Sequence, residues 1–365
     1  MSVYTEDVQS EVRGQLGLIT LNRPKALNAL SLAMVRELRD VLLRWQQDEK
    51  VLAVAIRGSN KEGAFGAFCA GGDIRFLHAA GMAGNPELED FFTEEYALNH
   101  LIHHYGKPYI AFMDGIVMGG GMGISQGGSL RLVTDRTKMA MPETAIGLFP
   151  DVGGGYFLSR CPGRVGEWLG LTGHTIGAAD AIAWGLADGC LPVEQLAAVW
   201  EGLGARSFAD GAAVEQWVVS HCVPPAASAP SGDRDAIDAY FALDSVQAIV
   251  TALESSGDAW ARATAETLRK RSPLMLYVVL EQIRRAREMN LATDLRMERD
   301  MVRHCFYLRP GQSETVEGIR ALAVDKDHAP RWNPARVEDV PAELVQAFFA
   351  SPWPAHAHPL AALKG

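Results

Sequence analysis

Residues 63–75 read GAFGAFCAGGDIR, a glycine-rich stretch between a predicted strand and a predicted helix. The strand is the apolar run at 51–58 (VLAVAIRG), which ends in glycine. The first turn of a helix carries backbone N–H groups without intrahelical acceptors, so a loop at this point can present donors to a ligand. By composition alone it is an ordinary strand-to-helix loop, because it lacks the GxGxxG spacing of a dinucleotide site.

The segment before this loop predicts a parallel strand–helix–strand unit. A second apolar run lies at 15–22 (QLGLITLN), and the helix between the runs has Ser31 as a candidate N-cap. Its apolar residues fall on one face at helical spacing: Met34, Leu38, Val41, Leu42 and Trp45. A crossover of this length joins parallel strands, with the helix covering one face of the sheet.

The pattern continues beyond the loop and predicts an α/β first half. A helix is expected at 89–105 and a strand at 108–116, followed by strands at 130–134 and 138–141. A second glycine cluster, GGGMG at 119–123, again lies between a strand and a helix. If the two loops converge, their N–H groups form an oxyanion hole for a carbonyl oxygen, in which one donor is typically worth about 3 kcal/mol.

The second half reads as mostly helical. Residues 224–234 (PPAASAPSGDR) continue neither a helical nor a strand pattern and predict a linker. We therefore expect domains at 1–223 and 235–350. Helices are expected at 235–253, 258–271 and 274–288. The tail at 351–365, rich in proline and histidine, is expected to be loose.

Composition excludes several classes of protein. The 365 residues are 48% hydrophobic and 21% charged, which is typical of a globular enzyme and not of a disordered or collagen-like chain. The net charge of −10 disfavours nucleic acid and anionic membranes as partners. Five scattered cysteines favour a reducing compartment. With an acidic first heptapeptide (MSVYTED) and no long apolar run, we expect a cytoplasmic protein outside the membrane.

Two motifs suggest other chemistry. Residues 123–127 match the GxSxG nucleophile elbow of serine hydrolases, but three glycines precede it and place Ser125 about one turn inside the predicted helix, where a packed small residue is the better interpretation. His100, His103 and His104 stand at helical spacing without a recognisable third metal ligand, so we interpret them as solvated or helix-end histidines and expect no metal site.

Glu143 and Asp151 are two carboxylates in the otherwise apolar and glycine-rich stretch 141–155 (MPETAIGLFPDVGGG). Carboxyl groups in apolar surroundings have raised pKa values and commonly serve as general acids or bases. Each also has an ordinary interpretation, as a helix cap for Glu143 and as a turn residue after proline for Asp151.

Together these segments resemble the crotonase (enoyl-CoA hydratase/isomerase) superfamily, and within it the 3-hydroxyisobutyryl-CoA hydrolase branch. The superfamily resemblance rests on four ordered segments: 21–29 (LNRPKALNA), 68–75 (FCAGGDIR), 118–123 (MGGGMG) and 141–155. The branch is indicated by 94–96 (EEY), 316–321 (VEGIRA), 325–327 (DKD) and 332–334 (WNP).

The resemblance implies roles for individual residues. The amides of Gly72 and Gly120 would hold the thioester oxygen, and Glu143 would match the second acid/base of the hydratases. Gly123 stands where hydratases carry their first glutamate, and Asp151 stands where they usually have glycine, the combination of the hydrolase branch.

The resemblance also implies the substrate contacts. Glu95 would match a glutamate that contacts substrate in the branch. The implied coenzyme A contacts are Lys25, Ala26, Leu27, Ala70, Asp73 and Ile74.

The implied fold is α/β, a spiral core of repeated ββα units followed by a helical region that closes the acyl-CoA site. The implied activity is hydrolysis of a short 3-hydroxyacyl-CoA without a separate cofactor, since coenzyme A is part of the substrate. The resemblance leaves the oligomeric state open, with a homo-oligomer among the states it allows. Alternatives are a hydratase or isomerase of the superfamily, a hydrolase using Ser125, and a non-catalytic member that binds coenzyme A or RNA. Whether Glu143 forms an anhydride or activates water stays open.

Overall fold

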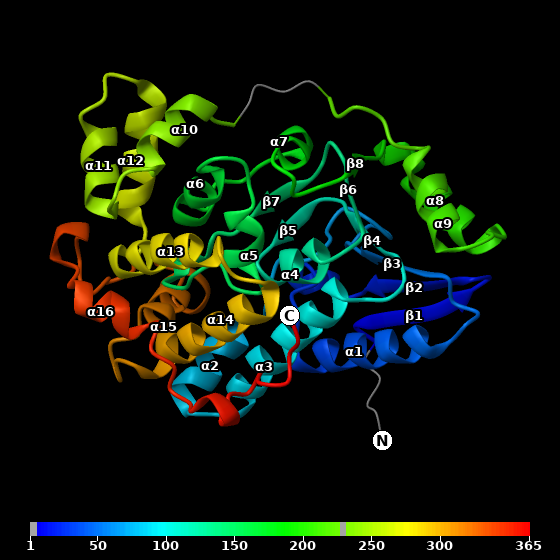
Figure 1. The fold of residues 1–365 in the computed structure, drawn as a ribbon, viewed down its shortest axis with the longest axis horizontal. Coiled ribbons are helices and arrows are strands. Elements are labelled where there is room, and N and C mark those ends of the chain that lie inside the picture. Colours follow the sequence, from blue (N-terminus) through cyan, green and yellow to red (C-terminus); the bar gives the residue numbers. More distant parts are fainter. Residues whose placement is uncertain (1–5, 227–230) are drawn as a thin grey trace. The chain divides into compact units, whose positions relative to one another are not determined.

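The computed structural model describes residues 6–226 and 231–365 (Figure 1). Residues 1–5 and 227–230 are outside this description, and with them part of the predicted linker and of the acidic first heptapeptide. The described residues form two compact units. The first unit contains 6–72, 97–139 and 175–226, and the second contains 73–96, 140–174 and 231–365.

The first unit contains a six-stranded sheet with the order β1-β2-β3-β4-β6-β8. β1 runs antiparallel to β2, and the other neighbours are parallel. β5 and β7 pair in a separate two-stranded sheet. The strands are β1 Val8–Arg13, β2 Leu16–Leu21, β3 Ala53–Gly58, β4 Tyr109–Met113, β5 Ile116–Met118, β6 Leu130–Val133, β7 Lys138–Ala140 and β8 Gly189–Cys190.

In chain order, the α-helices are α1 Leu32–Gln47, α2 Ile74–Ala83, α3 Glu87–His103, α4 Gly120–Gln126, α5 Gly154–Ser159, α6 Val165–Thr172, α7 Ala178–Ala183, α8 Leu196–Ala205, α9 Gly211–Val219, α10 Arg234–Phe241, α11 Val246–Glu254, α12 Ala259–Lys270, α13 Pro273–Ala286, α14 Leu291–Tyr307, α15 Glu314–Ile319 and α16 Ala342–Ala347. Short 3-10 helices include η1 Pro24–Ala26 and η2 Glu143–Ile146. In the described part of the chain, every helix is too short or too polar to cross a bilayer.

The predicted strand–helix–strand unit is confirmed. β2 and β3 pair in parallel from Leu16↔Ala53 to Leu21↔Gly58, with α1 between them in sequence. Ser31 caps α1 by accepting the Met34 N–H at 3.3 Å. A side chain at Gly17 would collide with the Trp45 ring, so α1 covers the face of β2 to which Gly17 points.

Helices α8 and α9 cover the opposite face of the sheet and complete the core of the first unit. The strands contribute Leu16, Leu18, Ala53, Ala55, Ile110, Phe112, Leu130 and Leu132, and the helical segment contributes Leu191, Leu196, Val199, Trp200, Leu203, Val214 and Val218. Alternate residues of each strand point to this face, as the two-residue period of a strand requires.

The second unit is helical, and its membership differs from the predicted domains. Residues 73–96 and 140–174 group with the C-terminal helices and not with the core at 1–223. The reason is packing: α5 and α6 lie against α13, and α2 lies against α15. A boundary placed from composition at 224–234 does not separate these two earlier segments from the first unit.

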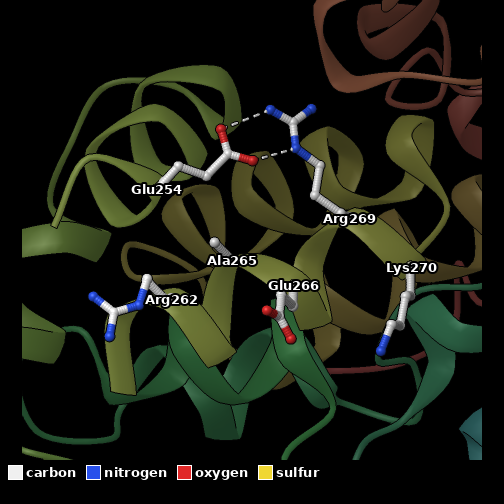
Figure 2. A pocket seen from close by; sticks show the side chains of 6 residues that line it. All are labelled: Glu254, Arg262, Ala265, Glu266, Arg269 and Lys270. Atoms are coloured by element: carbon white, nitrogen blue, oxygen red, sulfur yellow. Dashed lines mark hydrogen bonds and ion pairs between the residues drawn. The ribbon is translucent and has the colours of Figure 1, made fainter. Parts of the chain in front are cut away.

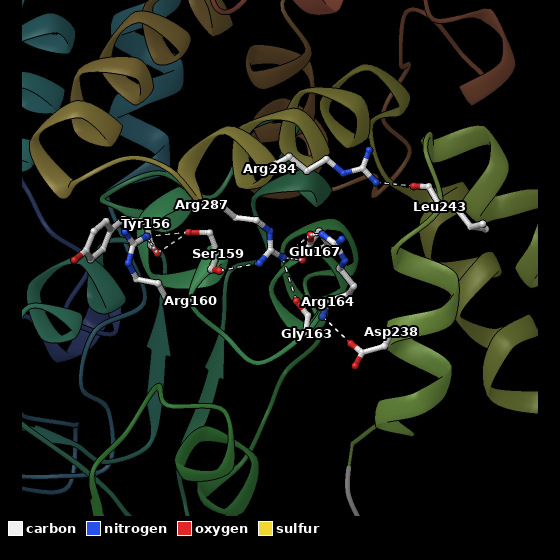
Figure 3. A network of polar contacts seen from close by, with 10 residues as sticks. All are labelled: Tyr156, Ser159, Arg160, Gly163, Arg164, Glu167, Asp238, Leu243, Arg284 and Arg287. Carbon is white, nitrogen blue, oxygen red and sulfur yellow. Dashed lines mark hydrogen bonds and ion pairs between the residues drawn. The ribbon is translucent and has the colours of Figure 1, made fainter.

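A buried ionic network joins α6 to α13 in the second unit (Figure 3). Glu167 on α6 is fully buried and accepts hydrogen bonds from Arg287 at 2.7 Å and from Arg164 at 2.9 Å. Arg284 donates to the Leu243 carbonyl at 2.5 Å and so joins α13 to the segment after α10. A buried charge paired in this way is costly to break.

The structure adds three details to the predicted elements. β1 is an edge strand that the sequence analysis missed, because VQSEVR is mostly polar. The expected helix at 235–253 is two helices, α10 and α11, separated at 242–245, where Ser245 caps α11. The tail at 351–365 buries His358 and Leu360.

Candidate active site

In the first unit the two glycine-rich loops meet. The Met118 N–H donates to the Cys69 carbonyl at 3.0 Å. A Cβ on Gly71, which has φ +108°, would lie 3.6 Å from the Gly120 nitrogen, so the backbones of the two loops are in close approach. Gly120 is the first residue of α4, where helical N–H groups have no acceptor within the helix.

These contacts bring together the two loops that carry the predicted oxyanion amides, those of Gly72 and Gly120. Leu30 and Gly72 form a parallel bridge, and Cys69 and Val117 form another. Gly121 allows the approach, because a Cβ there would lie 2.3 Å from the Cys69 carbonyl oxygen.

Asn28 supports the first loop and was missed by the sequence analysis. It is fully buried with φ +58°, and its Nδ2 donates to the Ser59 and Ala67 carbonyls at 2.8 Å each. Its Oδ1 accepts the Arg23 N–H at 2.8 Å. An asparagine after a proline-containing turn is a signal for the left-handed conformation, in which asparagine is enriched.

The predicted coenzyme A contacts separate into two groups. Lys25 and Ala26 lie on η1, and the carbonyl of Leu27 accepts the Ala70 N–H at 3.0 Å, so this group gathers in the first unit. Asp73 and Ile74 belong to the second unit, where Asp73 caps α2 and Ile74 is its first residue. The Asp73 carboxylate accepts the N–H groups of residues 75 and 76, which is a structural role.

In the second unit three of the predicted carboxylates are buried. Glu95 on α3 is 2% exposed, Glu143 at the start of η2 is 6% exposed, and Asp151 in the loop before α5 is 5% exposed. The Tyr96 hydroxyl donates a hydrogen bond to Asp151 Oδ2 at 2.8 Å.

These carboxyl groups interact electrostatically. Burial raises the pKa of Asp151 to about 6, against the hydrogen bond from Tyr96. Burial, and secondly the charge of Asp151, raise the pKa of Glu143 and of Glu95 well above their ordinary values. Groups whose pKa is moved toward neutrality are suited to exchange protons during a reaction.

Two oxygens in this cluster are buried and unpaired within the described part of the chain, Glu95 Oε1 and Glu143 Oε2. Buried polar atoms are nearly always hydrogen-bonded, and exceptions concentrate at functional sites. The unpaired oxygens therefore distinguish Glu95 and Glu143 from carboxylates that only hold structure, such as Glu167.

Tyr96 has a role that the sequence analysis did not assign. It stands in the quoted segment 94–96, yet its contact with Asp151 joins residues 55 positions apart. The available signal was its position directly after Glu95 in the quoted segment.

Ser125 is packed inside α4 and fully buried. Its Oγ lies 2.8 Å from the Gly121 carbonyl and 3.2 Å from that of Met122, to which it donates its proton. This is the back-bonding of a helical serine, and the geometry matches the interpretation as a packed small residue.

Replacing Ser125 with alanine is expected to leave kcat within about threefold of wild type, because the hydroxyl only bonds its own helix. Initial rates of free coenzyme A release, measured at saturating substrate, check this. A loss of thousands-fold in a variant that keeps its thermal midpoint would restore the serine-hydrolase interpretation.

The other motif that suggested different chemistry is the group of histidines at 100–104. Among the described residues no group of histidine, cysteine or acidic side chains has the arrangement of a metal site. The rings of His100 and His104 stack 4.2 Å apart near the end of α3.

A cavity of about 420 Å³ on α11 and α12 contains none of the predicted acyl-CoA residues (Figure 2). Its lining residues are Glu254, Arg262, Ala265, Glu266, Arg269 and Lys270. Arg269 is paired with Glu254 at 2.7 Å and with Glu338 at 2.7 Å, so its charge is already compensated.

Comparison with known proteins identifies the family. The family model described as enoyl-CoA hydratase/isomerase matches residues 16–349. The chain is 40% identical over 353 residues to a protein of Danio rerio named "3-hydroxyisobutyryl-CoA hydrolase, mitochondrial", covering 94% of this chain and 90% of that one. It is 38% identical to "3-hydroxyisobutyryl-CoA hydrolase 1" of Arabidopsis thaliana, covering 93% and 90%.

Solved structures agree on the fold. A crystal structure titled as a carnitinyl-CoA dehydratase from Mycobacterium thermoresistibile matches with a TM-score of 0.87 at 39% identity, covering 95% of this chain and 97% of that one. This chain therefore belongs to the enoyl-CoA hydratase/isomerase family and has the α/β crotonase fold.

Proposed function

We propose that this protein hydrolyses 3-hydroxyisobutyryl-CoA to 3-hydroxyisobutyrate and coenzyme A, as a step in valine breakdown. The observation that carries the proposal is the buried, electrostatically coupled pair of Glu143 and Asp151. Relatives that are 37–40% identical over more than 90% of the chain carry the name of this hydrolase, which supports the same reaction.

In the proposed reaction the carbonyl carbon of the thioester gains an oxygen from water and loses the sulfur of coenzyme A. The N–H groups of Gly72 and Gly120 stabilise the negative charge that develops on the carbonyl oxygen. Glu143 attacks the carbonyl carbon or removes a proton from the attacking water. The departing thiolate receives a proton, and Asp151 is the group that supplies or relays it.

The surroundings of Asp151 support a role in proton transfer. With a pKa of about 6 it changes charge close to neutral pH, and the Tyr96 hydroxyl fixes one of its oxygens. Because its charge also raises the pKa of Glu143, ionisation of one group favours protonation of the other, and the proposed reaction uses the form in which Glu143 is ionised and Asp151 holds the proton. Such a pair passes a proton without holding two negative charges at once.

The substrate's hydroxyl group needs a polar partner, and Glu95 is the proposed one. Its Oε1 is buried and unpaired among the described residues, and burial raises the pKa of its carboxyl group. A site built to hydrogen-bond a substrate hydroxyl discriminates strongly against analogues that lack it.

Hydration is the alternative reaction within the family, and α4 argues against it. A hydratase of this superfamily requires a glutamate at the position of Gly123 in addition to the one at Glu143, and Gly123, which lies in α4, has no side chain. The carnitinyl-CoA dehydratase title of the matching crystal structure keeps this alternative open to experiment.

We propose no cofactor beyond the coenzyme A of the substrate, and a reducing compartment such as the cytoplasm, which the five scattered cysteines of the sequence favour. The relatives from Danio rerio and Xenopus tropicalis are named mitochondrial, so subcellular fractionation is the experiment that decides the compartment.

The proposed reaction predicts that free coenzyme A is released from 3-hydroxyisobutyryl-CoA much faster than crotonyl-CoA is hydrated. Thiol release and enoyl consumption are measured with the same enzyme sample at the same substrate concentration. Isobutyryl-CoA, which lacks the hydroxyl, is the matched control and should be cleaved at least tenfold more slowly. The opposite ranking of hydrolysis and hydration would move the protein to the hydratases.

A further inference from the structure

The loop that carries Asp151 has an unfavourable backbone. Val152 has φ +58° and Gly153 has φ +87°, both in the left-handed region. That region is disfavoured for a β-branched residue such as valine, and a non-glycine residue persists there only where its surroundings hold it. Other contacts must therefore hold the loop in this conformation.

Glu298 on α14 supplies two of these contacts. It is fully buried, and its Oε2 accepts the Gly153 N–H at 2.7 Å while its Oε1 accepts the Gly155 N–H at 2.9 Å. Both carboxylate oxygens thus bond to the backbone that immediately follows Asp151.

Gln282 on α13 holds the other side of the same loop. Its Nε2 donates to the Pro150 carbonyl at 2.7 Å and to Glu298 Oε1 at 3.0 Å. Pro150 before Asp151, and Gly153 and Gly155 after it, are therefore held by hydrogen bonds. The two side chains that form them, Glu298 and Gln282, also bond to each other. Gln282 is also fully buried, so water does not compete for these bonds.

The charge of Glu298 faces other charged groups. Asp294, one turn earlier on α14, accepts the Tyr156 N–H at 2.9 Å and lies near Arg160. Burial, and then the charge of Asp294, raise the pKa of Glu298 well above its ordinary value; the N–H groups of Gly153 and Gly155 act in the opposite direction, and Asp151 raises it further. Burying a carboxyl group next to other acidic groups destabilises the folded protein, so holding the loop in this way indicates a function beyond stability.

We propose that Glu298, together with Gln282, is a positioning residue that fixes the carboxyl group of Asp151 for the reaction. Glu298 acts through the backbone of 150–155 and does not touch the thioester. This inference rests on the proposed function, because it needs Asp151 to take part in hydrolysis.

The test replaces Glu298 with glutamine, which keeps the size of the side chain but turns one acceptor into a donor that faces a backbone N–H. We expect kcat for 3-hydroxyisobutyryl-CoA hydrolysis to fall about 100-fold with KM changed less than threefold, because small misplacements of a reacting group cost about that much. The acid limb of the kcat–pH profile should also move, since the surroundings of Asp151 change.

Glu167→Gln is the matched control. Glu167 is an equally buried carboxylate of the same unit, but it bonds to Arg164 and Arg287 and not to the Asp151 loop. We expect this control to lower the thermal midpoint and leave kcat and its pH profile unchanged.

The decisive measurement adds Glu298→Gln to the Asp151→Asn variant. If Glu298 acts through Asp151, the second substitution has no further effect on kcat, whereas independent effects multiply. A full 100-fold additional loss, or a Glu298→Gln enzyme with wild-type kcat, would overturn the proposal. If Glu298→Gln does not fold, Gln282→Met is the second variant. It removes the bonds of Gln282 to Pro150 and to Glu298 but keeps the bonds of Glu298 to Gly153 and Gly155, and it should lower kcat about tenfold; unchanged kcat there would likewise overturn the proposal.

Failure of the proposed function gives a different result. If Asp151→Asn keeps wild-type turnover, or the wild-type enzyme releases no coenzyme A, the proposed function is wrong. If both of those assays behave as expected and only Glu298→Gln is without effect, the positioning role alone is wrong.

Discussion

Replacing Glu143 with glutamine is expected to lower kcat for 3-hydroxyisobutyryl-CoA hydrolysis by about 10³–10⁴-fold, the range typical for loss of a general base or nucleophile. Glutamine matches glutamate in size, so the change removes a charge and leaves no cavity. KM should change little, because coenzyme A affinity comes from contacts remote from the thioester. Thiol release at saturating substrate measures the effect.

The control for Glu143→Gln is again Glu167→Gln, a buried carboxylate outside the site. Wild-type kcat in that control excludes a general effect of removing buried charge. A Glu143→Gln enzyme with more than a tenth of wild-type kcat would show that another group attacks the thioester.

Replacing Asp151 with asparagine is expected to lower kcat by at least 100-fold while making the folded protein more stable at neutral pH. The loss of turnover follows from losing the group that exchanges the proton. The amide oxygen of asparagine still accepts the Tyr96 hydroxyl, so the loop keeps that contact.

The gain in stability follows from the raised pKa of Asp151. Its pKa is about 6 in the folded protein against 3.8 as the ordinary value, so the folded state binds more protons than the unfolded state between these two values. Wild-type stability therefore falls as pH rises from about 4 to about 6, and the loss persists above pH 6. Asparagine carries no charge to desolvate, and the shift of the Asp151 pKa corresponds to on the order of 3 kcal/mol at pH 7.5.

Thermal unfolding at pH 7.5 and at pH 4 checks this prediction. The variant should unfold at a higher temperature than wild type at pH 7.5, and the difference should shrink at pH 4. A variant that is less stable at pH 7.5 would mean that the charge of Asp151 is stabilised by its surroundings.

Patterns over many residues were predictable from the sequence. The parallel unit of β2, α1 and β3 follows from two apolar runs and one amphipathic helix, and the structure has it. The convergence of the glycine loops was predicted as a possibility, because each lies between a strand and a helix; the structure places the preceding strands, β3 and β5, in two different sheets. Such signals are strong since each rests on several residues that agree.

Contacts between single residues far apart in sequence were not predictable. The bond from Tyr96 to Asp151 and the bonds from Glu298 to Gly153 and Gly155 span 55 and more than 140 positions. Nothing local distinguishes Glu298 from the solvated acids of a charged helix, because α14 has charged residues on several faces.

The sequence analysis missed the edge strand β1 and placed the unit boundaries differently from the structure. β1 is mostly polar because one side of an edge strand faces solvent, so it lacks the apolar pattern of β2. Segments 73–96 and 140–174 join the helical unit through side-chain packing on α13 and α15, and composition does not report which partner a segment packs against.

The double variant Glu143→Gln, Asp151→Asn tests most directly the central claim that these two carboxyl groups act in one step of thioester hydrolysis. Its kcat for free coenzyme A release from 3-hydroxyisobutyryl-CoA is compared with that of each single variant. Residues that act as a unit are strongly non-additive, so the double variant is predicted to be at most threefold slower than the slower single variant. A kcat reduced by the product of the two single losses would contradict the claim, because it would show that the two groups act independently.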